Sequence, residues 1–286
     1  MEPLVARPRV WRCGACALDL SRALVMGILN ATPDSFSDGG SYADVDAAIA
    51  AGLRMRDEGA DILDVGGEST RPGAESVPVE REIERVVPVV EGLARVGMTV
   101  SVDTRHPVVA SAAMAVGAVI INDVSGFRDP AMVDLAAVSG AGLVVMHMLG
   151  EPRTMQADPV YGDVVLEVAD YLARQAAMLG SAGVDAAAIV IDPGIGFGKT
   201  TVHNLELLRR LDELTNLGYP VLIGASRKRF IGEISGAPLP RQRAAGSIAV
   251  ALDAVARGAS IVRVHDVKDT VRALAVARAI QGEDAR

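Results

Sequence analysis

Short apolar runs recur along the chain, and they predict the strands of a parallel sheet. Each run is rich in Val, Ile and Leu and is apolar at consecutive positions, not only at alternate ones. That pattern is typical of parallel strands that are buried on both faces. Eight such runs are present, at residues 24–29, 61–65, 99–102, 119–121, 143–146, 189–191, 221–223 and 261–264.

Alanine-rich stretches with helical spacing lie between these runs. Several of them are followed by a glycine, which is a common signal for the end of a helix. Alternating strands and helices predict an α/β fold with a parallel sheet. Eight such units in about 250 residues match a TIM (β/α)8 barrel, whereas an open, doubly wound sheet fits less well. The clearest helical stretches are residues 45–56, 80–95, 108–116, 164–179, 204–214 and 244–256.

No linker, low-complexity segment or change of composition divides the chain, so we expect a single barrel domain over residues 24–282. Residues 1–23 are predicted to be irregular apart from a short hairpin. Cys13 and Cys16 lie in that hairpin, and no second Cys or His pair at ligand spacing accompanies them. We interpret their spacing as chance, in preference to a redox pair or half of a zinc site.

Composition narrows the classes of function. The formal net charge of −8 argues against a general nucleic-acid surface or an anionic membrane surface. No apolar run reaches the roughly 18 residues of a membrane span, and no secretory segment precedes the cysteines. We therefore expect a cytoplasmic protein with reduced thiols. Only three of the 28 basic residues are lysines, Lys199, Lys228 and Lys268, so an anionic ligand would need a local basic site.

The stretch at 189–200, IVIDPGIGFGKT, joins a buried strand to an acid and a glycine-rich loop. It is not a phosphate-binding P-loop, because Pro193 stands where that motif needs a glycine. It is not a dinucleotide-binding motif either, since its glycines run G-x-G-x-G. Two interpretations are open. The loop presents Asp192 to a ligand, or it is an ordinary connection in which Asp192 caps the next helix.

Polar residues stand at or directly after the end of every predicted strand. In a TIM barrel these ends form one face, and the chemistry of the enzyme is built there. Polar groups at all eight ends are more than solubility alone explains. In chain order they include Asn30, Asp64, Asp103, Asn122, Asp123, His147, Asp192, Ser226, Arg227, Lys228, Arg263 and His265.

Three of these residues, Asp103, Asn122 and Asp192, would need hydrogen-bond donors if they are buried. A flat heterocycle with an amidine or guanidine edge satisfies a carboxylate with two parallel hydrogen bonds. The alternative is a polar network at the barrel mouth that binds no ligand.

A second group of residues is cationic or donates hydrogen bonds, and it suits a phosphate or diphosphate held with Mg²⁺. Simple solvation is the alternative for Arg71 and Arg227, because arginines are plentiful in this chain. That alternative is weaker for Lys228, which lies between two arginines directly after a buried strand. The group comprises Asn30, Thr70, Arg71, Lys228, Arg263 and His265.

The loops after the first two strands, at 32–40 and 66–77, are long and carry glycines at their ends. Such loops are typical of lids that exclude water when they close. Phe36 lies in the first loop, an odd position for a core residue. It suits a gate over an aromatic substrate, or an anchor that packs on the barrel rim.

Taken together, eight motifs resemble the dihydropteroate synthases of folate biosynthesis. The motifs occur in order, the resemblance covers the chain from about residue 12 to its end, and the combination is highly specific. We find no substitution at a position that the family uses for ligand contacts; Ala31, where relatives often have Val, is conservative. The motifs are VMGILNATPDSFSDGG at 25–40, DILDVGGESTRPGA at 61–74, VSVDT at 100–104, INDVSG at 121–126, VVMHMLGEPRTMQ at 144–156, VIDPGIGFGK at 190–199, VLIGASRKRFIG at 221–232 and RVHDV at 263–267.

The resemblance implies a TIM-barrel transferase that is a homodimer, requires Mg²⁺ and acts on small molecules. Such enzymes join (7,8-dihydropterin-6-yl)methyl diphosphate to p-aminobenzoate and release 7,8-dihydropteroate and diphosphate. The implied mechanism is dissociative, with the diphosphate leaving before the amine attacks.

The resemblance also implies a role for individual residues. Asp103, Asp192, Lys228 and Arg263 would be catalytic, and Asn30 would ligate Mg²⁺. The pterin would be held by Asp103, Asn122, Asp192 and Lys228. The diphosphate would be held by Asn30, Thr70, Arg71, Arg263 and His265. The p-aminobenzoate site would be formed by Phe36, Pro72, Phe197 and Ser226.

Two other functions remain open beside the synthase. One is a pterin-binding barrel that makes no dihydropteroate, such as an inactive paralogue or the methyltetrahydrofolate-binding module of a corrinoid methyltransferase. Such proteins can lack the loop at 226–228 and the first lid motif, both of which are intact here. The other is an aldolase that forms a Schiff base on Lys228, although flanking arginines suit an anion better than a desolvated amine.

Overall fold

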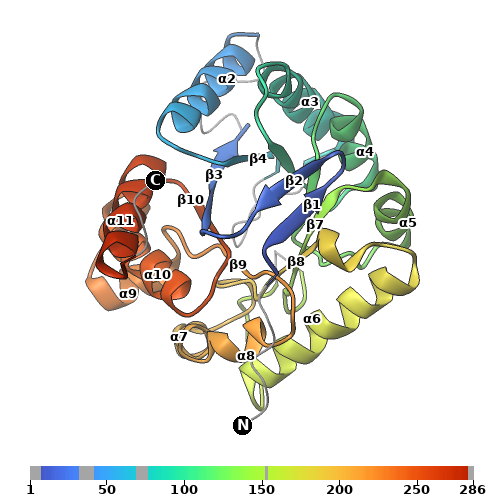
Figure 1. Cartoon of the computed structure of the whole chain (residues 1–286). Coiled ribbons are helices and arrows are strands. Elements are labelled where there is room, and N and C mark those ends of the chain that lie inside the picture. The colour runs from blue at the N-terminus through green and yellow to red at the C-terminus, as the bar shows by residue number, and fades with distance from the viewer. Residues whose placement is uncertain (1–7, 32–41, 69–76, 152–153, 283–286) are drawn as a thin grey trace.

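The computed structural model describes residues 8–31, 42–68, 77–151 and 154–282 of the 286-residue chain. Eight parallel strands lie at the centre and helices surround them (Figure 1). The strands are β3 (Leu24–Asn30), β4 (Ile62–Gly66), β5 (Val100–Asp103), β6 (Ile120–Asp123), β7 (Gly142–Met146), β8 (Ile189–Asp192), β9 (Leu222–Ile223) and β10 (Ile261–Val264). The TIM-barrel prediction is confirmed.

Seven strand pairs follow the order β8-β7-β6-β5-β4-β3-β10-β9, and the pairs are parallel. The barrel closes between β8 and β9. There a single parallel bridge joins Ile191 to Val221, and the Ile191 amide donates to the Pro220 carbonyl at 3.0 Å. This closure is the thinnest seam in the sheet.

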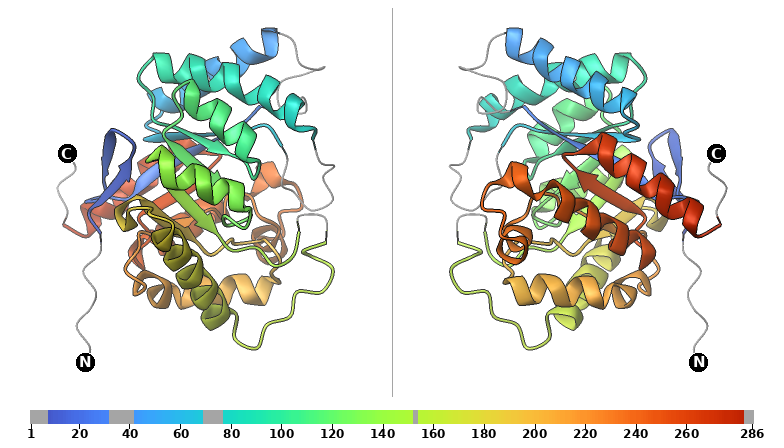
Figure 2. Two further views of the ribbon diagram at one scale, coloured as in Figure 1. Left: turned by 90° about the vertical axis from the view of Figure 1, so that its right-hand side faces the viewer. Right: turned by 90° about the vertical axis from the view of Figure 1, so that its left-hand side faces the viewer.

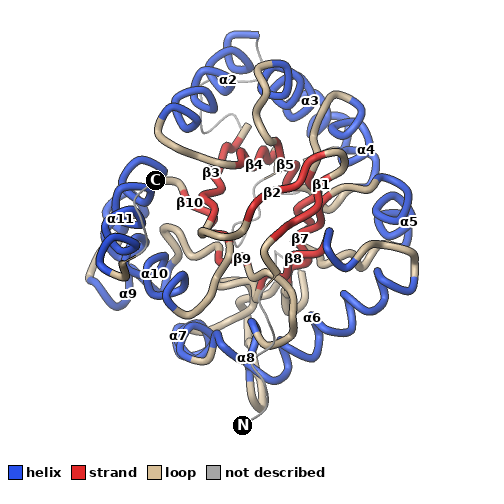
Figure 3. The backbone as a smooth tube through the Cα atoms, in the orientation of Figure 1, coloured by secondary structure: helices blue, strands red, loops and turns tan. Residues whose placement is uncertain are grey.

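The outer ring of helices occupies the stretches between the strands (Figure 3). The predicted stretch at 204–214 is two helices, because Arg210 leaves helical geometry at φ −107° and ψ 33°. The other helical predictions agree with the structure to within a few residues. The helices are α2 (Tyr42–Asp57), α3 (Val79–Arg95), α4 (Pro107–Ala115), α5 (Pro130–Ser139), α6 (Val164–Ser181), α7 (Thr201–Arg209), α8 (Leu211–Thr215), α9 (Arg229–Ser235), α10 (Ala244–Ala256) and α11 (Val267–Ile280), with 3₁₀ turns η1 (Ala186–Ala188) and η2 (Pro240–Arg243).

Side chains alternate between the two faces of each strand, which divides the core into two parts. Leu63 and Val65 of β4 pack outward against the helices. Their neighbour Ile62 faces the barrel interior instead. It belongs to an apolar layer that also contains Leu24, Met26, Ile120, Val144, Val190, Leu222 and Ile261. We call this layer the floor of the barrel.

An antiparallel hairpin, β1 (Val10–Cys13) and β2 (Cys16–Asp19), covers the end of the barrel beneath the floor (Figure 2). Trp11 is fully buried against the floor residues, and its indole Nε1–H donates to the Ala188 carbonyl at 2.8 Å. Cys13 is buried and Cys16 exposed, and both are free thiols. Burial raises the pKa of the Cys13 thiol well above its usual range.

Within the described residues, no helix combines the length and the apolar character needed to cross a bilayer.

Candidate active site

A polar layer lies directly above the apolar floor, and strand alternation places it there. The inward-facing positions are two residues apart along each strand. Two residues beyond Ile62, Ile120, Val190 and Ile261 of the floor come four polar side chains. They are Asp64, Asn122, Asp192 and Arg263, and together with Asp103 at the end of β5 we call them the polar layer.

Asp64 connects most of this layer. Its Oδ2 accepts a hydrogen bond from the Arg263 Nε at 2.5 Å and another from the Asn122 Nδ2 at 3.0 Å. The Arg263 Nη2 donates in turn to the Asp103 Oδ2 at 2.5 Å. The structure thus brings together Asp103 and Asn122, which were predicted for the pterin, and Arg263, which was predicted for the diphosphate. The sequence analysis gave Asp64 no role, although a carboxylate inside an apolar strand was the available signal.

Both acids of the predicted pterin site are buried, and burial is the main cause of their altered acidity. It raises the pKa of Asp103 to about 7, against the opposing effect of the Arg263 charge. Asp64 raises the pKa of Asp103 further through charge repulsion. Burial raises the pKa of Asp192 to about 6, although the Gly194 amide and the Arg263 and Lys228 charges lower it. Such carboxylates gain strongly from a partner that donates hydrogen bonds.

Within the part of the chain that the structure describes, three buried oxygen atoms in this region have no hydrogen-bond partner. They are the Asp64 Oδ1, the Asp103 Oδ1 and the Ser101 Oγ. Buried polar atoms in folded proteins almost always have partners, so a group of unpaired acceptors indicates that something else supplies the donors. The polar layer is therefore suited to bind a ligand with several donors on one edge.

Lys228 and Phe197 approach each other from different loops. The Lys228 Nζ lies over the Phe197 ring, 3.8 Å from its centre. Cation–π contacts of this kind attract when the ammonium sits over the ring face. Lys228, predicted for the pterin, and Phe197, predicted for p-aminobenzoate, are thus neighbours.

The segment that follows β9 is held by its own side chains. Ser226 Oγ lies 3.0 Å from the His265 Nδ1 and also accepts from the His265 amide at 3.2 Å. Arg227 adopts φ +58°, and its guanidinium binds the Asp266 carboxylate at 2.5 Å and 3.1 Å. Simple solvation is therefore the wrong interpretation of Arg227. Its ion pair fixes the backbone between Ser226 and Lys228.

Asp192 does not cap the following helix. Its Oδ1 accepts from the Gly194 amide at 2.7 Å, within its own turn. The cap of α7 is Thr200, whose hydroxyl accepts from the His203 amide at 3.2 Å. Of the two interpretations of this stretch, the capping one is wrong, and the acid faces the barrel interior.

Asn30 ends β3 beside Gly66 of β4 and is half-buried. Within the described residues, no hydrogen bond links the Asn30 side chain to the polar layer. Phe36, Thr70, Arg71 and Pro72 lie outside the described residues, as do most positions of the two predicted lids.

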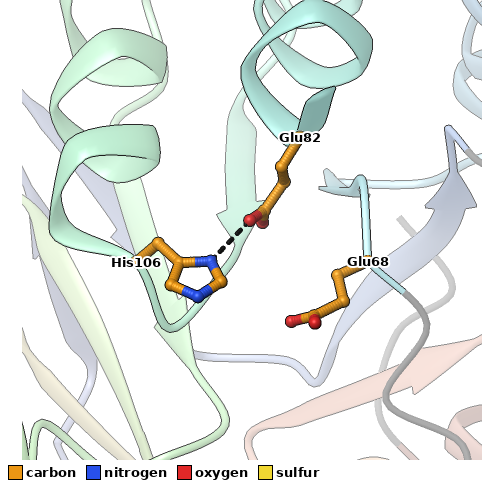
Figure 4. A group of neighbouring side chains, drawn as sticks. All are labelled: Glu68, Glu82 and His106. Carbon is orange, nitrogen blue, oxygen red and sulfur yellow. Dashed lines mark hydrogen bonds and ion pairs between the residues drawn. The ribbon is translucent and has the colours of Figure 1, made fainter. Parts of the chain in front are cut away.

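A second polar cluster lies beside the mouth, where Glu68, Glu82 and His106 converge (Figure 4). Their potential metal-binding atoms lie within 4.8 Å of one another. Two of them are already paired, because the His106 Nδ1 is 2.7 Å from the fully buried Glu82 carboxylate. Arg105 donates to both Glu68 oxygens at 3.2 Å and 3.3 Å. We assign this cluster a structural role, since it ties the end of β4 to the starts of α3 and α4.

The barrel and the polar layer at its mouth define a class of protein, a TIM-barrel enzyme whose ligand-binding residues stand at the C-terminal ends of the strands. Comparison with known proteins defines the class more closely. The pterin binding enzyme family matches residues 26–265. The dihydropteroate synthase of Neisseria meningitidis serogroup C is 50% identical over 269 residues, which cover 93% of this chain and 95% of that protein. The synthase of Escherichia coli K12 is 48% identical over 264 residues, covering 92% and 93%.

Solved structures of dihydropteroate synthases are also similar to this chain. Dihydropteroate synthase of Xanthomonas albilineans with 4-aminobenzoic acid superposes with a TM-score of 0.90 at 51% identity, covering 96% of this chain and 98% of that one. The same enzyme in complex with 7,8-dihydropteroate gives a TM-score of 0.86 at 45% identity, with 96% and 99% covered. The chain belongs to the pterin-binding enzymes, and within them to the dihydropteroate synthase family of transferases. These relatives favour the synthase over both other functions considered from the sequence.

Proposed function

We propose that the chain joins (7,8-dihydropterin-6-yl)methyl diphosphate to p-aminobenzoate at the mouth of the barrel. The bond between the methylene carbon and the diphosphate oxygen breaks first, and its electron pair leaves with the diphosphate. The amine nitrogen then uses its lone pair to form the new carbon–nitrogen bond and releases a proton to solvent. The products are 7,8-dihydropteroate and diphosphate.

The unpaired acceptors of the polar layer carry this proposal. The Asp103 Oδ1 and the Asp64 Oδ1 are buried and receive no hydrogen bond from any described residue, and Asp192 and Asn122 face the same interior. A pterin presents several N–H donors along one edge, which suits such a row of acceptors. In the proposed complex Asp103, Asn122, Asp192 and Lys228 hold the pterin.

The same acids have a second task when the diphosphate leaves. Positive charge then develops on the pterinylmethyl group, and preorganised carboxylates stabilise it without having to reorient. Asp103 and Asp192 are fixed by hydrogen bonds from Arg263 and from the Gly194 amide, respectively. Because an arylamine attacks as the neutral base, the reaction needs no strong general base.

Cationic and donor groups would hold the leaving diphosphate. We assign this task to Arg263 and His265, with Thr70 and Arg71 from the second loop. Asn30 fits Mg²⁺, because Mg²⁺ prefers oxygen ligands and is usually held by one or two protein groups together with substrate phosphates. Bound there, Mg²⁺ would offset the negative charge that gathers on the diphosphate.

The amine substrate would bind beside the pterin. The centre of the Phe197 ring lies 3.8 Å from the Lys228 Nζ, and Ser226 precedes Lys228 by two residues in the same turn. Phe36 and Pro72 would complete this subsite. From the roles assigned in the paragraphs above, catalysis would depend on Asp103, Asp192, Lys228 and Arg263.

Diphosphate release tests the proposal. Wild-type protein with pterin diphosphate and Mg²⁺ should release diphosphate only when p-aminobenzoate is present, and dihydropteroate should form. Lys228→Ala and Asp192→Asn should each lower the turnover roughly 100-fold, since each removes a group that acts on the developing charge. Lys268→Ala, on the exposed surface of α11, is the matched control and should keep wild-type rates. Pterin binding without product would contradict the proposal and favour a non-synthase barrel.

We also propose that the enzyme is a homodimer that works in the cytoplasm. The free thiols Cys13 and Cys16 are consistent with a reducing compartment.

On α10, Ser247, Ala251 and Ala254 are buried against the barrel, whereas Ala245 and Ala249 point outward as a face of small residues. Sedimentation equilibrium would reveal a monomer if the dimer is wrong.

A further inference from the structure

The glycine-rich loop between Asp192 and Lys199 is held by side chains from outside the loop at two of three consecutive carbonyls. Gln156 donates its Nε2–H to the Gly196 carbonyl at 2.8 Å. Tyr161 donates its hydroxyl to the Gly198 carbonyl at 2.8 Å. Between them, the Phe197 carbonyl accepts from the Lys199 Nζ at 3.0 Å. A loop rich in glycine has little rigidity of its own, so these bonds help to fix its shape, together with the bond from the Gly196 amide to the Asn204 Oδ1 at 2.7 Å.

Lys199 is buried, with 3% of its surface exposed, and the reaction described above does not use it. An ammonium has three donors. Lys199 places them on the Phe197 carbonyl, on the His147 Nδ1 at 2.9 Å and, more distantly, on the His147 carbonyl at 3.5 Å. The amine therefore links the loop to the residue that follows β7.

The other end of this link is rigid. The His147 ring packs edge-on against Tyr171, with 4.9 Å between the ring centres. Burial, and then the Lys199 charge, lower the pKa of His147 to about 2, so the ring is neutral. Its Nδ1 accepts when the Lys199 Nζ donates across their 2.9 Å contact. Burial also lowers the pKa of Lys199 to about 7, while the Asp192 charge opposes that shift. Burying an amine is costly, and an apolar side chain would fill the same space at less cost.

We infer that Lys199 is a positioning residue, which fixes the Phe197 backbone to His147 and so sets the ring of Phe197 beneath Lys228. The inference rests on the proposed function, in which Phe197 forms the p-aminobenzoate subsite. Asp192 depends less on Lys199, because the Gly194 amide, Arg263 and Lys228 also support its charge. Lys199 therefore acts mainly on the amine substrate and only weakly on the pterin.

A structural test uses fluorophenylalanine, because the chain contains only four phenylalanines. In ¹⁹F NMR spectra of the full chain, the Phe197→Leu variant identifies the Phe197 signal. Lys199→Met keeps an unbranched side chain of nearly the same length but removes its donors, and it should shift or broaden that signal. Lys268→Met, an exposed lysine, should leave the spectrum as in wild type. An unchanged Phe197 signal in Lys199→Met would overturn the inference.

A kinetic test separates positioning from simple support of the fold. Lys199→Met should raise the KM for p-aminobenzoate about tenfold or more, while the Kd for the pterin substrate changes less than about threefold. Lys199→Gln keeps an N–H donor group on a shorter side chain and should fall between wild type and Lys199→Met. It also serves as the test variant if Lys199→Met does not fold. A lower melting temperature with both constants unchanged would mean that Lys199 only stabilises the fold.

The two tests also distinguish this inference from the proposed function. If wild type shows no turnover that depends on p-aminobenzoate, the proposed function fails, whereas the ¹⁹F result still decides whether Lys199 positions Phe197. If wild type turns over normally and neither Lys199 variant changes the KM for p-aminobenzoate, the inference fails and the proposed function stands.

Discussion

Asp64 accepts hydrogen bonds from two other residues of the polar layer, a role that its sequence position did not reveal. It is an acid within an apolar strand, and its importance depends on partners 58 and 199 positions further along the chain. Sequence analysis could place Asp103, Asn122, Asp192 and Arg263 at strand ends because position alone determines that. It could not show which donor meets which acceptor, because that depends on barrel register and side-chain reach.

Asp103 and Asp192 should make the unliganded barrel less stable as the pH rises. Burial raises the pKa of Asp192 from 3.8 to about 6, so the folded state holds its proton where the unfolded chain has lost it. Stability from this group is therefore full below pH 4 and is lost as the pH rises from about 4 to 6. Asp103, with a pKa of about 7, extends the same trend upward.

Asp192→Asn should flatten this dependence, since the substitution removes the charge but keeps the shape. We expect the variant to unfold at a higher urea concentration than wild type at pH 8. Its free energy of unfolding there should be higher by on the order of 2 kcal/mol, with a smaller difference at pH 4. Its turnover should nevertheless collapse. Asp134→Asn on the exposed face of α5 is the control. A variant less stable than wild type at pH 8 would contradict this account of Asp192.

Among the elements, the strands were the easiest to predict and the loops the hardest. All eight strands occur within two residues of the predicted bounds, because a two-sided apolar run has few other structures open to it. The division of α7 from α8 at Arg210 was missed. At this position the backbone leaves the helix, and the Arg210 guanidinium binds both Glu213 in the next turn and Asp163, 47 residues earlier in the chain. Helical periodicity alone does not reveal such a break.

The turn after β8 should tolerate no side chain at its first glycine. Gly194 adopts φ +66°, and a Cβ there would lie 1.9 Å from the His147 carbonyl oxygen. Gly194→Ala must therefore move backbone, and we expect it to cost more than about 3 kcal/mol of folding stability. Gly97→Ala is the matched control, since Gly97 has φ +79° with open space around it and should cost about 1 kcal/mol. Equal costs in urea denaturation would refute the steric explanation.

For the whole molecule, sequence analysis gave the correct architecture but not the way its two ends differ. The hairpin was predicted, yet nothing in its sequence showed that Trp11 closes the barrel beneath the floor. That contact joins residues 177 positions apart, at Trp11 and Ala188. The molecule thus separates a part that stabilises the fold from a part that binds ligand.

Trp11→Ala should test this separation. Removing a fully buried indole should cost about 3–5 kcal/mol of folding stability, because it leaves a cavity against the floor. At 20 °C the surviving folded protein should keep a near-normal KM for both substrates, since the polar layer lies on the other side of the floor. Val10→Ala, at a position 46% exposed, should cost little. Far-UV circular dichroism in urea and steady-state kinetics measure the two effects, and a large change in either KM would show that the ends are coupled.

The seam between β8 and β9 is a place where bound substrate would stabilise the barrel. Among the described residues, one bridge and the neighbouring hydrogen bond close the barrel there, whereas the other side of β8 pairs with β7 through four registered positions. Asp192 ends one side of the seam, and the segment carrying Lys228 continues from the other. A pterin held by both residues would link the two sides of the seam. Without ligand, the strands should therefore separate locally and transiently along the seam. Amide hydrogens near Ile191 and Val221 should then exchange with solvent faster than those of β4, and ligand binding should slow that exchange.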